Sequence, residues 1–183
     1  MAKINLDDMN QEYFDVLREI GNIGTGNATT ALSQMLNCKV DMNVPQVKLL
    51  EVSHAGELMG GEELIMAGIY LGVQGDIKGS ILFLLEKESA QTLVERLLGT
   101  PSSGDELSEM EQSALKEIGN IITASYLNSL STLTNLVIYP SVSALSVDMA
   151  GAILSVPAIV FGTIADKLLL IQTQFFDGLN GYF

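Results

Sequence analysis

The chain is poor in the residues that usually build metal sites and covalent-catalysis sites. Among its 183 residues there is one cysteine, Cys38, and one histidine, His54. A single cysteine excludes an internal disulfide and any zinc site made of several cysteines. A single histidine leaves no histidine cluster, and we interpret His54, in the loop-like segment 53–56, as a solvated residue. The sequence therefore predicts no metal site of its own.

Basic residues and long apolar segments are also scarce. Nine Lys and Arg residues stand against 22 Asp and Glu, which gives a formal charge of −13. This balance disfavours nucleic acid and anionic membranes as partners, because both attract clustered Lys and Arg. The most apolar run, residues 149–162, is too short to span a bilayer, and we predict that it is a core strand. The N-terminus turns acidic too early for a signal peptide, so we expect a cytoplasmic protein without membrane insertion.

One short segment occurs twice. Residues 17–23 read Leu-Arg-Glu-Ile-Gly-Asn-Ile and residues 115–121 read Leu-Lys-Glu-Ile-Gly-Asn-Ile, a separation of 98 residues. This repetition indicates a duplicated unit. The polar residues that need an explanation are Glu19, Asn22, Glu117 and Asn120.

Helical periodicity predicts a helix over residues 8–36. At 100° per residue, Asp15, Glu19 and Asn22 fall on one face, and a broad apolar face lies opposite. Gly24 falls on the core side, where it permits close packing, and Gly26 falls beside the polar group, where another surface can approach. The apolar face comprises Tyr13, Phe14, Leu17, Ile20, Gly24, Ala28, Ala31 and Met35.

A second helix is predicted to begin at a capping box formed by Ser108 and Glu111. Ser113, Glu117 and Asn120 share its polar face. Its inward face comprises Leu107, Ala114, Leu115, Ile118, Ile122, Ser125, Ser129 and Leu133. Another helix is expected over residues 89–98, followed by a linker at 101–105. Strands are expected at residues 39–44, 47–52, 65–73, 79–85, 137–139, 144–147, 152–159 and 168–173, with a hairpin turn at 177–181.

The predicted domain is a single unit, residues 1–183, made of two repeats at about 8–100 and 106–183. By this symmetry the second repeat lacks most of a strand and the counterpart of the helix at 89–98. We therefore expect the chain to stop short of the natural domain end, which leaves the strand 168–173 partly unpaired.

Each polar group offers a carboxylate and, one helical turn later, a primary amide. The group has neither a nucleophile with an adjacent base nor a metal cluster, so it is poorly equipped for independent catalysis. An asparagine amide can orient water, however, and positioning supplies most of the catalysis in phosphoryl hydrolysis. The simplest alternative is a solvated helix face, but this gives no reason for both copies to keep Glu and Asn.

The pattern Asp/Ser-x-x-x-Glu-x-x-Asn followed by 22 residues and proline resembles the CheC/CheX/FliY family of phosphatases. These enzymes act on the phosphorylated chemotaxis response regulator CheY. The first half matches through Asp15, Glu19, Asn22 and Pro45. The second half matches at Ser113, Glu117 and Asn120, but Ser143 stands where the family has proline, with Pro140 nearby. Two intact sites without an appended flagellar-switch domain are most similar to the CheC branch.

The resemblance implies an α+β fold of two pseudo-symmetric α-β-x-β-β repeats that share a central sheet, with two long site-bearing helices on the surface. It implies that Asn22 or Asn120 positions the attacking water and that Glu19 or Glu117 pairs with a lysine of CheY. The Mg²⁺ would belong to CheY, and this chain would need no cofactor of its own. It also implies that the receptor deamidase CheD is a partner, with Asp148 as a contact.

Two other hypotheses stay open at this point. The chain can be a non-catalytic adaptor that only binds CheY or CheD. Alternatively, Gly21, Gly24 and Gly26 can form a phosphate-binding loop, but their spacing is not that of a dinucleotide or P-loop motif, and no lysine follows.

Overall fold

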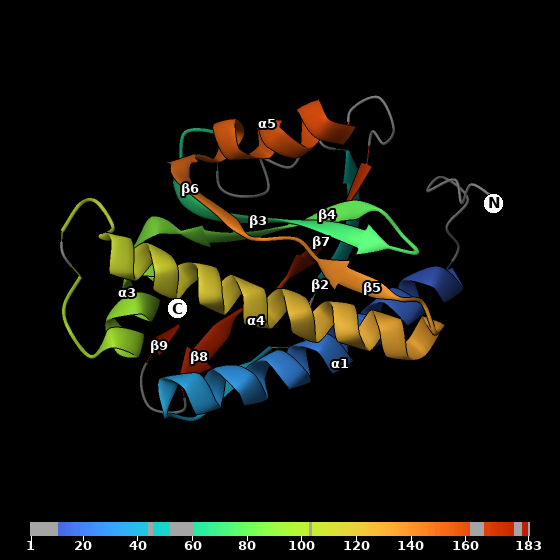
Figure 1. Cartoon of the computed structure of the whole chain (residues 1–183), viewed down its shortest axis with the longest axis horizontal. Helices are drawn as coiled ribbons and strands as arrows, with labels where there is room; N and C mark the ends of the chain where they lie inside the picture. Colours follow the sequence, from blue (N-terminus) through green and yellow to red (C-terminus); the bar gives the residue numbers. More distant parts are fainter. Residues whose placement is uncertain are drawn as a thin grey trace.

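The computed structural model describes residues 11–43, 46–51, 61–102, 104–161, 167–177 and 181–182. These residues form a mixed α+β fold with antiparallel sheets (Figure 1). The elements in chain order are α1 (Gln11–Leu36), β1 (Val40–Met42), β2 (Gln46–Glu51), β3 (Ile65–Gly75), β4 (Gly79–Glu86), α3 (Lys87–Leu98), α4 (Glu109–Thr134), β5 (Ile138–Pro140), β6 (Ala144–Met149), α5 (Ala150–Phe161), β7 (Lys167–Gln172), β8 (Phe175–Asp177) and β9 (Gly181–Tyr182).

Strand β3 organises the largest sheet. It pairs with β4 on one side and with β5 and β6 on the other, so the two halves of the chain hydrogen-bond to each other. The same cross-pairing recurs elsewhere, because β1 pairs with β8 and β2 pairs with β7. Strand β7, which was predicted to be partly unpaired, has β2 along one edge over all six of its residues, and among the described residues no strand pairs with its other edge.

The sheet around β3 lies between helices on both faces (Figure 1). Successive side chains of a strand point to opposite faces. A side chain at Gly68 would meet Ile153 of α5, whereas the next residue, Ile69, lies against Gly119 of α4. The α4 side carries the main core, in which Ile69, Leu115 and Ile118 are fully buried.

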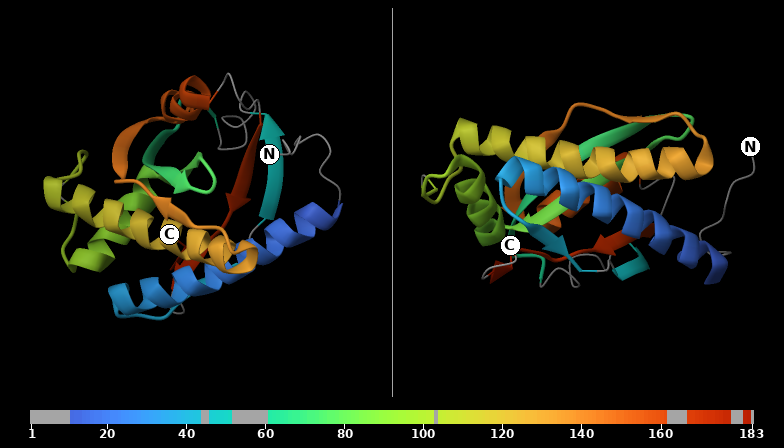
Figure 2. Two further views of the ribbon diagram at one scale, coloured as in Figure 1. Left: turned by 45° about the vertical axis from the view of Figure 1, so that its right-hand side comes forward. Right: turned by 90° about the horizontal axis from the view of Figure 1, so that it is seen from below.

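Helices α1 and α4 lie side by side and run in opposite directions (Figures 1 and 2). Gly24 makes this approach possible, since a Cβ there would lie 2.6 Å from the Tyr126 ring. The neighbouring Thr25 hydroxyl and the Tyr126 hydroxyl form a 2.8 Å hydrogen bond across the interface. The prediction that Gly24 permits close packing on the core side is therefore confirmed.

Both long helices end at an asparagine in the left-handed conformation, Asn37 with φ 50° and Asn135 with φ 56°. Asparagine tolerates this conformation better than most residues with a side chain. At the start of α4 the predicted capping box is present. The Ser108 hydroxyl accepts a hydrogen bond from the Glu111 N–H, and the Glu111 carboxylate accepts one from the Ser108 N–H at 2.7 Å. Gly99 ends α3 as predicted, with φ 68°.

Two sequence predictions are wrong. Residues 152–159 belong to helix α5 and not to a strand. Ala150, Ile153 and Leu154 are buried at helical spacing, and Ala150 and Ile153 pack against Met66 of β3. A uniformly apolar run does not reveal this spacing. Leu133 was expected to face inward, but its exposed fraction is 49%.

Candidate functional site

The first predicted site lies on α1. Asp15, Glu19 and Asn22 are all exposed there, as the periodicity predicted. The Asp15 carboxylate accepts a 3.4 Å hydrogen bond from Arg18, one turn along the helix. Asn22 makes no side-chain hydrogen bond within the part of the chain that the structure describes. Its amide donor and acceptor are therefore both available to a partner.

The second predicted site lies on α4. Glu117 is exposed and Asn120 is half-buried. The Asn120 amide donates a hydrogen bond to the Glu117 carboxylate at 3.4 Å, which aligns the two groups. The Ser113 hydroxyl donates to the backbone carbonyl of Glu109 at 2.8 Å, so it is satisfied within its own helix. The two sites therefore carry the same Glu-x-x-Asn pair in different local surroundings.

A buried glycine precedes each asparagine. Gly119 lies directly on the sheet, where a Cβ would come within 2.7 Å of the Ile69 side chain. Gly21, at the corresponding position of α1, is buried as well. At Gly119 the glycine lets the helix sit low on the core, while the next side chain, Asn120, points outward.

The segment near the second site that lacks the family proline is tied to β3. The Ser141 N–H donates to the Gly72 carbonyl at 2.8 Å, and the Gly72 N–H donates to the Ser141 hydroxyl at 2.9 Å. This pair of bonds restrains the segment that contains Ser143. Pro45, its counterpart in the first half, and His54 lie outside the described residues.

Asp148, the predicted CheD contact, lies on β6 far along the chain from both helical sites. Its side chain is exposed, and its carboxylate accepts a 2.8 Å hydrogen bond from the Met149 N–H. Within the described residues Asp148 forms no hydrogen bond or ion pair with either Glu-Asn group, and β6 pairs with β3 through Met66 at this position.

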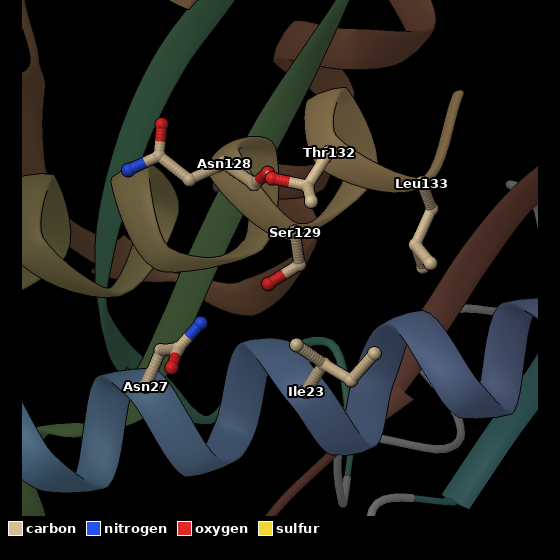
Figure 3. A pocket seen from close by; sticks show the side chains of 6 residues that line it. All are labelled: Ile23, Asn27, Asn128, Ser129, Thr132 and Leu133. Carbon is tan, nitrogen blue, oxygen red and sulfur yellow. The ribbon is translucent and has the colours of Figure 1, made fainter. Parts of the chain in front are cut away.

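A surface hollow that the sequence analysis missed lies between α1 and α4 (Figure 3). Its volume is about 170 Å³, and its lining residues are Ile23, Asn27, Asn128, Ser129, Thr132 and Leu133. Ile23 directly follows Asn22, so the hollow borders the first site. The one sequence feature that could have indicated this hollow is the apolar residue Leu133 near the polar end of α4. Helical periodicity assigned Leu133 to the core instead.

Within the described residues no group of three or more His, Cys, Asp or Glu side chains could hold a metal ion. None of the described helices is both long and apolar enough to cross a membrane. The chemistry on offer at each site is thus a carboxylate for ion pairing and an amide for orienting a small polar molecule.

The chain is similar in sequence to the CheC-like family and to one of its phosphatases. The model of the CheC-like family matches residues 14–49 and 110–142, which contain both Glu-Asn groups. The CheY-P phosphatase CheC of Bacillus subtilis is 39% identical over 170 residues, which cover 91% of this chain and 81% of that protein.

Two solved structures share the fold. FliY of Thermotoga maritima matches with a TM-score of 0.77 at 20% identity, covering 96% of this chain and 88% of the other. CheX in the CheX–CheY–BeF3–Mg²⁺ complex of Borrelia burgdorferi matches with a TM-score of 0.55 at 17% identity, covering 88% and 92%. These two structures show the fold. The 39% identity to CheC over most of both chains, together with the match to the family model, establishes that the chain belongs to the CheC-like family.

Proposed function

We propose that this chain is a phosphatase of phosphorylated CheY. The observation that carries the proposal is its 39% identity, over most of both chains, to a CheY-P phosphatase. The Glu-Asn groups on α1 and α4 support it, because an exposed carboxylate and an adjacent amide offer the positioning chemistry that phosphoryl hydrolysis needs.

In this proposal each asparagine enters the active site of the regulator and orients the attacking water. Its amide carbonyl accepts a hydrogen bond from the water, which turns an oxygen lone pair toward phosphorus. Glu19 or Glu117 pairs with a lysine of CheY and fixes the approach. The Mg²⁺ that stabilises the phosphoryl charge is supplied by CheY, in keeping with the CheX–CheY complex that contains it.

We also propose that the two halves are copies of one unit within a single domain. Helices α1 and α4 have 26 residues each and begin 98 residues apart. Strands β1 and β5 begin at the same separation, as do β2 and β6. The left-handed Asn37 and Asn135 also lie 98 residues apart.

The test is the lifetime of phosphorylated CheY with and without this protein. We expect the wild-type protein to shorten the lifetime and the double variant Asn22→Ala/Asn120→Ala to leave it at the regulator's own value. Binding of CheY loaded with beryllofluoride should survive in the double variant. A wild-type protein that binds CheY without changing this lifetime would instead be a non-catalytic adaptor.

CheD is proposed as a second partner, bound around Asp148. Its carboxylate is exposed on β6, an element separate from the two helices that carry the Glu-Asn groups, so it can be tested separately from them. Asp148→Ala should weaken CheD binding in a pull-down or titration and leave the phosphatase rate unchanged. Unchanged affinity for CheD would remove Asp148 from this interface.

A further inference from the structure

The surroundings of the two Glu-Asn groups differ in one respect that the repeat does not explain. Val16 lies one turn before Glu19 on the same side of α1, and its exposed fraction is 55%. Ile23 lies one turn after Glu19 and lines the hollow between the helices. Leu133, 49% exposed, lines the same hollow from α4 (Figure 3). We call Val16, Ile23 and Leu133 the apolar strip.

At the second site only one of the three corresponding positions is alike, since Ile121, 98 residues after Ile23, is also a half-buried isoleucine. Ala114, 98 residues after Val16, is 8% exposed and belongs to the core. Met35, 98 residues before Leu133, is half-buried and packs on the core cluster. An isolated exposed apolar residue needs no explanation. Here two exposed residues, Val16 and Leu133, are grouped with the half-buried Ile23 beside a hollow and a functional group, which indicates an interaction surface.

Polar groups surround the strip. The side-chain amides of Asn27 and Asn128 stand at the hollow without a hydrogen bond inside the described segments of the chain. A partner that inserts an apolar side chain between Ile23 and Leu133 therefore finds hydrogen-bonding groups around it, the arrangement typical of binding hot spots.

We propose that the apolar strip is a docking surface for CheY bound at the α1 site, and that the α4 site binds CheY without it. The inference rests on the proposed function. Its occupant follows from continuity: Ile23 is adjacent to Asn22 in sequence, and both Val16 and Ile23 lie one turn from Glu19, so a protein that covers Glu19 and Asn22 also covers the strip. Leu133 thus serves the site of the opposite helix.

The experiment isolates each site in the full-length protein. Asn120→Ala leaves the α1 site alone, and Asn22→Ala leaves the α4 site alone. Val16→Thr/Leu133→Gln is then added to each, since these changes remove apolar contact without adding charge. We expect the KM for phosphorylated CheY to rise about tenfold when only the α1 site works, and less than twofold when only the α4 site works. The kcat should stay constant in both backgrounds.

Val156→Thr, at an exposed apolar position of α5 on the other face of the sheet, is the matched control and should change nothing. Two results would overturn the strip as a docking surface: an equal rise of the KM in both backgrounds, or a fall in kcat at constant KM. Thermal melting confirms that the variants are folded. If the wild-type protein leaves the lifetime of phosphorylated CheY unchanged, the proposed catalysis fails, and titration with beryllofluoride-loaded CheY then tests the strip alone. If Val16→Thr/Leu133→Gln binds this CheY as tightly as the wild-type protein does, the strip is not a docking surface.

Discussion

The α1 and α4 sites have the same Glu-x-x-Asn pair on helices of equal length, yet their surroundings differ. Asn22 is exposed beside exposed apolar side chains, whereas Asn120 is half-buried and bonded to Glu117. The α4 helix begins at a capping box whose Glu111 is buried, and the sequence of α1 has Tyr13 where α4 has Glu111. The same Glu-Asn pair therefore has different neighbouring residues in the two sites. These neighbours can change the affinity for the partner without changing the catalytic groups.

The largest expected effect separates the two sites directly. If the proposed catalysis is correct and the sites act independently, Asn22→Ala and Asn120→Ala each keep part of the wild-type rate, and the two residual rates add up to it. The double variant should lose about a hundredfold, which is about 2.7 kcal/mol of transition-state stabilisation. The decay of phosphorylated CheY measures all three rates.

Gln34→Ala, which removes another exposed amide of α1, is the control and should behave like the wild-type protein. If one single variant is as inactive as the double variant, the two sites depend on each other. They would then act as one composite site.

Much of this comparison was accessible from the sequence, because helical periodicity is a strong signal over 26 residues. It placed Glu19, Asn22 and Glu117 on exposed faces, and the family resemblance is confirmed by the relatives. The pairing of β3 with β5 and β6 was not accessible, since strand register depends on contacts between distant segments.

The segment 149–162 was misread for a different reason. It contains no polar residue whose spacing could separate a buried helix from a buried strand, except Ser155. What decides the outcome is tertiary: the Ala150 N–H donates to the Leu64 carbonyl and the Gly151 N–H to the Glu62 carbonyl, which starts α5 over the sheet. The hollow beside the first site was missed likewise, because it exists only where α1 meets α4.

The second prediction tests how tightly the α4 site is held on the core. In Gly119→Ala the new methyl group would lie 2.7 Å from the side chain of Ile69, which is fully buried, so Ile69 must shift. Overpacking of this kind costs about 1–3 kcal/mol, partly offset by the better helix propensity of alanine, so we expect a net loss of about 1–2 kcal/mol. Urea denaturation measures it, and an unchanged midpoint would mean that the sheet yields to α4 easily.

The third prediction concerns the capping box of Ser108 and Glu111 at the start of α4. Glu111 is buried, and its carboxylate accepts hydrogen bonds from both the N–H and the hydroxyl of Ser108, at 2.7 and 2.6 Å. Glu111→Ala leaves these donors unpaired, and we expect a loss of about 1 kcal/mol in the free energy of unfolding. Ser108→Ala should cost a similar amount, and the double variant should cost less than the sum, because both changes remove the hydrogen bond from the Ser108 hydroxyl to the Glu111 carboxylate.

The smallest effect is expected for Gly26→Ala, a substitution that makes the α1 site more like the α4 site. Gly26 lies on the exposed face beside Asn22, and a Cβ there meets nothing within 4 Å, whereas α4 has Ala124 at the corresponding position. Gly26→Ala should raise the free energy of unfolding by about 0.5–1 kcal/mol, since alanine favours a helix interior over glycine. Because the α4 site already carries this methyl group, the phosphatase rate in the Asn120→Ala background should change less than twofold. A large loss of rate without a loss of stability would mean that CheY approaches α1 more closely than α4, which would make Gly26 a specificity residue of the first site.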